Sequence, residues 1–220
     1  MRRILPCFVA LIVLTSSARG QSCQGLSSFS TSPLQLTGEA SLTGDSRAVG
    51  AGVAAGFPRG PFGQVAVANR THENFGGSSI GVAAAAGYAV PLGSASRVHL
   101  CPVIGGMLEM GPNNAFGSGV ERSRRSAQLG VAIGTELSPV RQWNIIPSAG
   151  LFYAFQRDQA EDAGGAVLFQ IDDYYALAQL GVGLVFKSRL SLRPYVDLPL
   201  SLPSTEPTVG LTVGYSIGKP

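Results

Sequence analysis

The segment 77–81 reads Gly-Ser-Ser-Ile-Gly, which is the spacing of a hydrolase motif in which the serine acts as nucleophile. That motif places the serine on a sharp turn between a strand and a helix, and a histidine and an acid are brought to it from elsewhere. No helical pattern follows residue 81, and the chain has two histidines, His72 and His99. A glycine and serine loop that leads into a strand explains the segment better than a nucleophile does.

The segment 50–55 reads Gly-Ala-Gly-Val-Ala-Ala and loosely matches the glycine-rich loop that binds dinucleotides. That loop needs a strand before it and a helix after it, and this context is missing here. Small residues on one face of a strand explain the segment better. No cluster of histidines and cysteines has the spacing of metal ligands, so the sequence predicts neither a cofactor nor a metal site.

Regular alternation of side chains predicts strands along most of the chain, because successive side chains of a strand point to opposite faces. The segment 208–217 is the clearest: its odd-numbered residues are Val, Leu, Val, Tyr and Ile, and its even-numbered residues are Thr, Gly, Thr, Gly and Ser. Segment 62–70 has the weakest pattern, and Pro194 and Pro199 count against a smooth strand in the segment that contains them. The other segments expected to form strands are 34–43, 47–57, 79–90, 97–110, 126–137, 143–155, 174–186 and 190–200.

The first twenty residues have the features of a secretion signal. A basic start and the apolar stretch 8–14 precede a small-x-small cleavage site at 18–20. The net charge of +3 is carried by three arginines of this segment, so the remaining chain is neutral and gives no argument for binding nucleic acid. We therefore predict a signal peptide at 1–20 and a periplasmic N-terminal segment at 21–33.

Charged residues make up 13% of the chain, whereas about 25% is usual for a soluble domain. A surface that contacts lipid explains this deficit. The two cysteines outside the signal, Cys23 and Cys101, form an even pair in an oxidising compartment, and they are either disulfide-bonded or two unpaired thiols. The residues before Cys23 are a poor match to a lipoprotein cleavage site.

The predicted fold is all-β: residues 34–220 form a single antiparallel up-and-down transmembrane β-barrel of eight to ten strands. Apolar faces would contact lipid, and small or polar faces would line a lumen. The barrel should be closed, because an open sheet edge in lipid leaves backbone groups unpaired. Short turns are expected at the periplasmic end and longer loops outside, the latter at 69–77, 111–125 and 157–173.

The closing residues 208–215, Thr-Val-Gly-Leu-Thr-Val-Gly-Tyr, match a C-terminal barrel-assembly signal at its constrained positions. With the strand pattern over 34–217, this motif makes the chain resemble the small outer-membrane β-barrel proteins of bacteria, the opacity and surface-antigen, porin-like group. The resemblance implies that the barrel-assembly machinery reads Gly210, Val213 and Tyr215. Chains of this class usually end on the aromatic residue, whereas here residues 216–220 follow.

Several ionisable side chains should point into the lumen. A structural network is expected there, because buried charges have to be paired. The alternative is a barrel enzyme that uses His99 and acidic groups near the outer rim. The residues expected in the network are Glu39, Arg97, His99, Glu109, Glu136, Arg193 and Asp197.

Two further groups of residues are candidates for contacts outside the lumen. Arg122, Arg124 and Arg125 fall in a predicted outer loop, where they are either solvated or bind phosphates of lipopolysaccharide or a partner. Aromatic residues on the outward faces are expected to form girdles at the two membrane interfaces, or to pack on their neighbours. These aromatic residues are Tyr88, Trp143, Tyr153 and Tyr174.

The sequence favours a non-enzymatic protein of the bacterial outer membrane with a structural or surface-interaction role, in adhesion or membrane integrity. A small barrel has an interior just wide enough for side chains, so a general pore is not expected. The alternatives are a narrow porin-like channel for ions or small solutes, a lipid-modifying enzyme, and a soluble exported β-barrel binder. Expected partners are outer-membrane lipid and the barrel-assembly machinery, and no residue pattern identifies a surface partner.

Overall fold

Antiparallel strands make up most of the described structure, a computed structural model. The described residues are 23, 32–44, 46–57, 60–73, 77–93, 97–113, 119–140, 142–201 and 206–217. Within these ranges, none of the segments is a helix of the length and apolarity needed to cross a membrane.

Most strands lie where the alternating pattern predicts them, and several are longer than predicted. Segment 62–70, the weakest in pattern, lies within a strand of 13 residues. The strands are β1 (Leu34–Thr43), β2 (Ser46–Gly56), β3 (Gly60–His72), β4 (Ser78–Pro91), β5 (Val98–Met110), β6 (Glu121–Thr135), β7 (Leu137–Val140), β8 (Trp143–Glu161), β9 (Val167–Phe186), β10 (Leu190–Pro199) and β11 (Thr208–Ile217).

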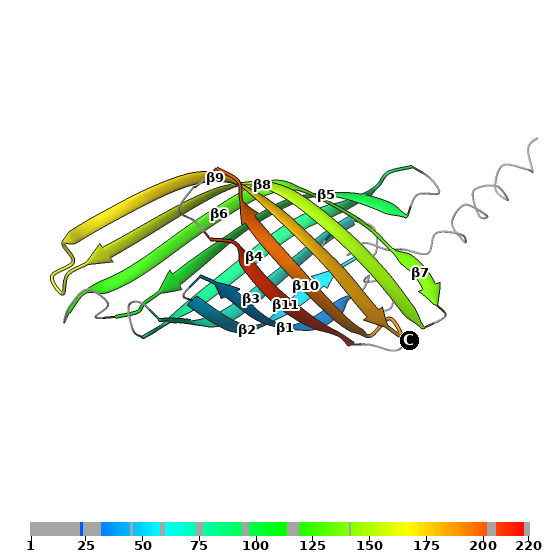
Figure 1. Cartoon of the computed structure of the whole chain (residues 1–220), viewed down its shortest axis with the longest axis horizontal. Helices are drawn as coiled ribbons and strands as arrows, with labels where there is room; N and C mark the ends of the chain where they lie inside the picture. The colour runs from blue at the N-terminus through cyan, green and yellow to red at the C-terminus, as the bar shows by residue number, and fades with distance from the viewer. Residues whose placement is uncertain are drawn as a thin grey trace, which may run out of the picture.

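The sheet closes into a barrel, as Figure 1 shows. Apart from β6 and β7, strands that are neighbours in sequence pair with each other, and β1 also pairs with β11, from Leu34 opposite Ile217 to Thr43 opposite Thr208. The short strand β7 continues β6 after Glu136, and both pair with β8, so the wall has ten strands. This confirms the predicted up-and-down barrel and decides between eight and ten strands.

The alternation in sequence separates an apolar outer face from a smaller, more polar inner face. In β1, Leu36 is 47% exposed, whereas the neighbouring Gln35 is fully buried. Val53, Ile104 and Leu180 are likewise exposed on the outside of their strands. A continuous outer band of this kind is what a barrel in lipid requires.

Aromatic side chains border the apolar band at both ends. Trp143 packs against Phe186 at one end, with ring centroids 4.9 Å apart, and the ammonium group of Lys187 lies 5.1 Å from the Phe186 centroid. At the other end, Tyr174 contacts Tyr153 and Phe155 at centroid distances of 6.3 and 5.0 Å. These positions are the ones expected of interfacial girdles.

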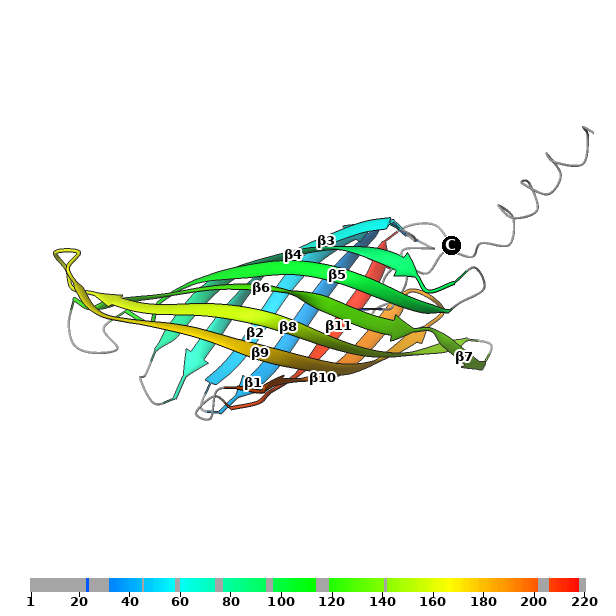
Figure 2. The same cartoon turned by 90° about the horizontal axis from the view of Figure 1, so that it is seen from above.

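The strands extend to different heights around one rim of the barrel. We call the rim where β1 begins and β11 ends the proximal rim, and the opposite one the distal rim. At the distal rim the hairpin of β8 and β9, with β6 paired beside it as far as Glu121, projects beyond strands such as β10, β1 and β2, and Figure 2 shows this from a second direction. The strands that follow the hairpin around the barrel, β10, β11, β1 and β2, are shorter.

The structure corrects the predicted loops at 69–77, 111–125 and 157–173. β3 runs on to His72. β6 already begins at Glu121, and β8 and β9 run on as a ladder to a turn at 162–166. The apolar alternation that predicted the strands ends where lipid contact ends, but polar pairs such as Arg157 opposite Asp172 continue the ladder. Pro194 does interrupt the ladder between β9 and β10, as expected of a residue without a backbone donor.

Candidate functional site

Apolar side chains pack together in the proximal half of the lumen. Phe62 and Phe152 are the largest members of this layer, and each is 5% exposed. The layer comes from six strands, β2 to β6 and β8, whereas the facing wall of β10, β11 and β1 contributes buried polar residues such as Ser191 and Gln35. The apolar layer consists of Cys23, Ala54, Phe62, Ala89, Cys101, Val103, Ala132 and Phe152, with Leu177 packed against it.

Glycines on the inner face make room for this packing. A Cβ atom on Gly87 would lie 2.5 Å from the ring of Phe62, and one on Gly130 would lie 2.6 Å from the ring of Phe152. Atoms cannot approach this closely without displacement, so each ring lies over a glycine of the adjacent strand. The lumen-facing glycines therefore position the two aromatic rings that fill the lumen.

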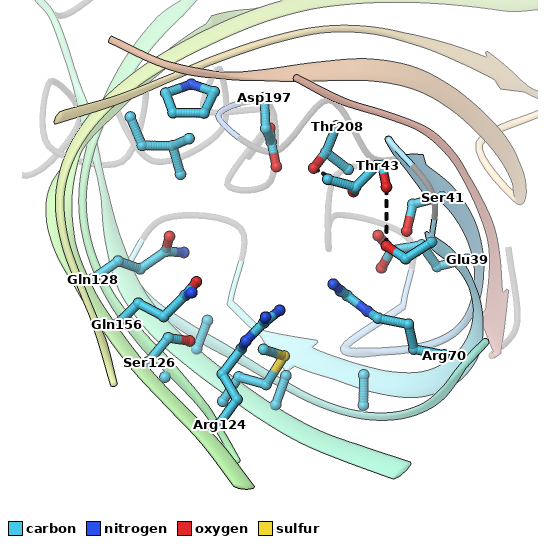
Figure 3. A pocket seen from close by; sticks show the side chains of 18 of the residues that line it. Glu39, Ser41, Thr43, Arg70, Arg124, Ser126, Gln128, Gln156, Asp197 and Thr208 are labelled. Atoms are coloured by element: carbon cyan, nitrogen blue, oxygen red, sulfur yellow. Dashed lines mark hydrogen bonds between the residues drawn. The ribbon is translucent and has the colours of Figure 1, made fainter. Parts of the chain in front are cut away.

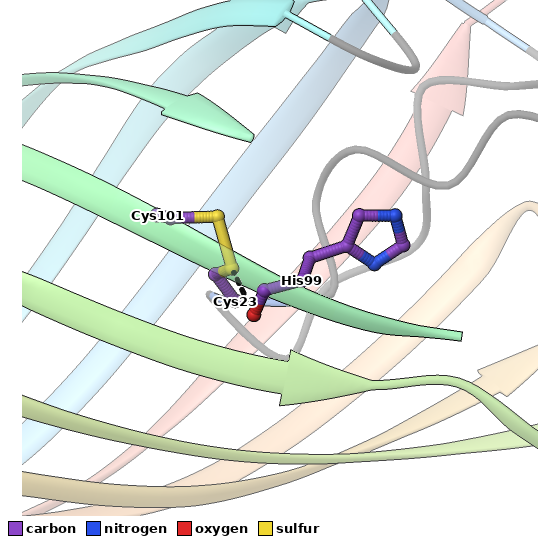
Figure 4. Close-up of a disulfide and its surroundings, with 3 residues drawn as sticks. All are labelled: Cys23, His99 and Cys101. Carbon is purple, nitrogen blue, oxygen red and sulfur yellow. Dashed lines mark hydrogen bonds between the residues drawn. A yellow bond between two sulfur atoms is a disulfide. The ribbon is translucent and has the colours of Figure 1, made fainter. Parts of the chain in front are cut away.

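A disulfide fixes one member of the apolar layer. Cys23 and Cys101 are bonded, with their Cα atoms 6.2 Å apart, and both residues are almost fully buried. The Sγ atom of Cys23 also lies 3.3 Å from the carbonyl oxygen of His99 in β5 (Figure 4). Because Cys101 points into the lumen, the disulfide holds Cys23 inside the proximal half of the barrel.

A polar vestibule occupies the distal half of the lumen. It is a cavity of about 710 Å³ whose walls carry carboxylates, guanidinium groups, amides and hydroxyls. Figure 3 shows the side chains of Arg70, Arg124, Glu39 and Asp197 directed into the cavity from different parts of its wall, with Arg70 on the same side as Glu39. Leu177 lines the vestibule and also packs on the apolar layer, so the layer forms the floor of the vestibule.

One cluster of the vestibule wall joins β1, β9 and β10. The hydroxyl of Tyr195 donates a hydrogen bond to Glu39, and Gln179 bridges Arg193 and Asp197 at 3.2 and 2.9 Å. Arg193 is 8% exposed and lies over Gly181, where a Cβ atom would be 2.8 Å from its Nε. Three residues of the predicted network, Glu39, Arg193 and Asp197, thus meet here.

A second cluster joins β3, β4 and β5 around Glu109. The carboxylate of Glu109 accepts a hydrogen bond of 2.5 Å from the hydroxyl of Ser79 and lies 3.4 Å from Nε2 of His72. Arg70 approaches the same carboxylate at 3.9 Å. Burial lowers the pKa of His72, against the opposing effect of Glu109, so the imidazole is neutral at pH 7.

Ser79 is the serine of the hydrolase-like segment 77–81, and the fold brings it to a histidine and an acid. Its oxygen lies 3.1 Å from Nε2 of His72. A catalytic triad needs the acid on the other ring nitrogen, whereas Glu109 lies at the same Nε2 as the serine. Ser79 is also only 1% exposed. The cluster therefore cross-links three strands and does not have the geometry of a nucleophile with its base.

A third cluster joins β6 and β8 at the distal rim. Arg122 and Arg124 both donate hydrogen bonds to Asp158, through Nε of Arg122 at 2.7 Å and through a terminal nitrogen of Arg124 at 2.9 Å. Burial would raise the pKa of Asp158, but the two guanidinium groups outweigh it and hold that pKa below its usual range. Asp158 was not expected as a site residue, because its partners were assigned to a loop.

The other residues predicted for the surface loop and the lumen network do not all lie where they were expected. Arg122 and Arg124 face the lumen from a strand, and Arg125 points outward, because β6 begins before them and alternates along them. Arg97 precedes β5 and is exposed, so it lies outside the lumen clusters. His99 and Glu136 are buried near the proximal rim, where Glu136 accepts a hydrogen bond from Asn144.

The predicted assembly-signal residues lie in β11, on both faces of the barrel. Val213 and Tyr215 point outward and are 38% and 49% exposed. Gly210 points inward, where the ring of Tyr195 occupies the space that a side chain would need. Among the described residues no three histidine, cysteine or acidic side chains are placed to hold a metal ion.

Several solved structures of bacterial barrel proteins are similar to this chain. No protein-family model matches the chain, and no curated protein does. Similar solved structures include the N-terminal β-barrel domain of OprF from Pseudomonas aeruginosa, with 16% identity over 84% of this chain and 96% of that one and a TM-score of 0.32. The β domain of the Bordetella autotransporter BrkA has 11% identity over 84% and 98% of the two chains and a TM-score of 0.40.

A third similar structure is the KdgM porin in complex with oligogalacturonate, with 9% identity over 83% of this chain and 99% of that one and a TM-score of 0.35. At these identities and TM-scores the likeness concerns the fold alone. The barrel architecture is shown by the closed strand pairing described above, and no function is taken from the individual neighbours.

Proposed function

We propose that the chain is a bacterial outer-membrane barrel with a structural and surface-contact role, and that its lumen is closed at rest. The observation that carries this proposal is the apolar layer across the proximal half of the lumen. Water and ions cross a barrel through a polar lumen, whereas here two phenylalanine rings and small apolar side chains are packed to 5% exposure or less.

The outer surface supports insertion into lipid. The apolar band and the aromatic residues at both of its ends fit a membrane interior bounded by two interfaces. We assign the distal rim, which carries the tall hairpin and the longest connections, 111–120 and 200–207, to the cell surface, and the proximal rim to the periplasm. In this orientation Gly210, Val213 and Tyr215 belong to the strand that the assembly machinery would read.

Planar lipid bilayers test whether the lumen is closed. Purified, refolded protein should show no stable conductance steps, because the apolar layer excludes water. The double variant Phe62→Ala/Phe152→Ala should conduct, since it removes both rings from the layer. Met107→Ala is the matched control: this residue lines the vestibule but lies outside the apolar layer, so the variant should stay closed. Stable steps from the wild-type protein would contradict the proposal.

The second candidate function is a narrow channel for ions or small solutes. The charged vestibule favours it, because a cavity of about 710 Å³ that is lined by guanidinium groups and carboxylates would admit small polar solutes. Conductance of the wild-type protein, with ion selectivity that changes in Arg70→Gln or Glu39→Gln, would establish the channel in place of the closed barrel.

A further inference from the structure

The outer part of β9 has a strand on one side only, as far as the described residues go. β8 pairs with β9 as far as Val167, but β10 pairs with it only between Phe186 and Leu177. Above that point the described chain provides no β partner for β9 from Gln170 to Tyr175. We call residues 170–175 the open edge. In Figure 2 the hairpin that carries it projects past the neighbouring strand β10.

The backbone groups of the open edge can be assigned to their sides. Ala176, the last residue before the edge, accepts a hydrogen bond from the backbone nitrogen of Leu200 at 2.8 Å and donates one to the hydroxyl of Ser201 at 3.0 Å. The backbone N–H and C=O of Ala176 therefore both point away from β8. Because this direction alternates along an antiparallel strand, the donors and acceptors of Tyr174, Asp172 and Gln170 point to the same open side.

The side chains near the open edge suit pairing with another strand. Ile171 and Tyr174 are 53% and 58% exposed, and Val167 and Leu168 beyond them are exposed to a similar degree. Branched and aromatic residues favour strands. A long exposed edge of this composition is a template for an added strand, unless charges prevent it.

The charges around the open edge select among partners. Glu161, Asp162, Asp172 and Asp173 lie in this part of the hairpin, and Arg157, bonded to Asp172 at 2.7 Å, is the one basic residue in β8 and β9. In an antiparallel pair of two copies centred on Ile171, the two Asp172 carboxylates would be diagonal neighbours. Like charges across a sheet destabilise pairing, so a second copy is disfavoured and a basic strand is favoured.

We propose that the open edge binds an extended, basic polypeptide segment of a partner protein, which adds as a strand beside β9. Backbone hydrogen bonds to Gln170, Asp172 and Tyr174 would hold the segment, and its lysines or arginines would meet Asp173 and the acids at the tip. This proposal rests on the surface-contact role proposed above and names the class of partner for it.

The test uses refolded protein in detergent micelles and a fluorescent peptide in which lysine and valine alternate, with binding followed by fluorescence polarisation. Gln170→Pro removes a backbone donor on the open side and leaves the ladder with β8 intact, since proline is tolerated on edge strands. We expect it to bind about tenfold more weakly than wild type. Gln170→Ala is the matched control, because it keeps the backbone donor and should bind like wild type.

Two further measurements keep the proposal falsifiable if the proline variant misfolds. The same peptide with every second backbone nitrogen methylated should fail to bind the wild-type protein, because it cannot pair with the edge. Asp173→Asn should weaken binding of the basic peptide and leave binding of a serine-for-lysine peptide unchanged.

Four outcomes would overturn the proposal. They are no binding of the basic peptide by wild type, equal binding by Gln170→Pro, binding of the methylated peptide, and a wild-type dimer that Gln170→Pro abolishes. The last would assign the edge to a second copy. None of these outcomes depends on whether the lumen conducts, so failure here is distinct from failure of the closed-barrel proposal.

Discussion

At the scale of the residue, several lumen-facing glycines, among them Gly87, Gly130 and Gly210, are explained by the large side chains that lie over them. Alternation in the sequence places glycine on the inner face, but it does not show which neighbour fills the space. A Cβ atom on Gly130 would lie 2.2 Å from the carbonyl oxygen of Leu151 and 2.6 Å from the ring of Phe152. The backbone cannot move aside as a flexible side-chain end does, so any side chain at 130 displaces the wall or the ring.

Gly130→Ala should therefore destabilise the barrel by about 1–3 kcal/mol, the usual range for overpacking. Gly38→Ala is the matched control, because its nearest atom would be 4.0 Å from the added Cβ. Urea unfolding in lipid vesicles, followed by the fluorescence of Trp143, measures both. Equal midpoints for the two variants would contradict the packing described for Gly130.

The pair formed by Asp158 with Arg122 and Arg124 should make the distal wall sensitive to acid. A carboxyl with a depressed pKa stabilises the fold above its unfolded pKa, about 3.9, and the contribution is lost as pH falls through the lower folded value. Asp158→Asn should be less stable than wild type at pH 7 by about 1–2 kcal/mol. The difference in urea midpoint should shrink below about pH 3.9, and a difference that is constant with pH would argue against the ion pair.

Ser79 should be unreactive, although the chain places a histidine and an acid beside it. It donates its hydrogen bond to Glu109 and is 1% exposed, so neither a free base nor an approach path is present. A fluorophosphonate probe should leave the folded protein unlabelled. Labelling that disappears in Ser79→Ala would show a reactive serine and reopen the enzymatic alternative.

For the charged side chains of the lumen, the sequence predicted the direction but not the hydrogen-bond partners. The inward direction of Glu39, Glu109, Arg193 and Asp197 followed from their parity in the strands. Their partners did not, because Gln179 and Tyr195 come from strands whose register cannot be read from one sequence.

At the scale of the element, the strands were predictable wherever one face contacts lipid. In β4 and β11, apolar residues that face lipid alternate with small or polar residues that face the lumen, and this pattern predicted both strands. Above the apolar band the signal vanishes, so the outer parts of β8 and β9 were predicted as a loop. What continues them is cross-strand pairing of polar groups such as Arg157 with Asp172, which leaves no periodic pattern in the sequence.

The tall hairpin should be dispensable for closure of the barrel. Replacing residues 159–170 by Asn-Gly joins Asp158 to Ile171, which are register partners, through a tight hairpin turn. The band strands and the Asp158 cluster remain, so the folded protein should still migrate differently before and after boiling. Binding of the basic peptide should be lost. A truncated chain that no longer folds would show that the hairpin contributes to closure.

At the scale of the whole molecule, closure was predictable and the division of the lumen was not. A chain whose strands have one apolar face must close in lipid to pair its edges, and β1 does pair with β11. The apolar layer, in contrast, is assembled from side chains of six strands and from Cys23. Sequence alternation assigns Ala54, Cys101 and Phe152 to the inner face, but it assigns no face to Phe62 or Cys23. Only the tertiary arrangement shows that these residues pack together in one half of the lumen and leave the other half as a vestibule.

The central claim, a closed barrel in the outer membrane, is tested most directly by fractionation combined with heat-modifiability. Outer membranes are extracted with detergent, and the protein is run on a denaturing gel with and without boiling. The account predicts that the protein is found in this fraction and that boiling shifts its mobility, because the closed sheet resists the detergent until heated. A protein found in the soluble fraction, with the same mobility before and after boiling, would contradict it.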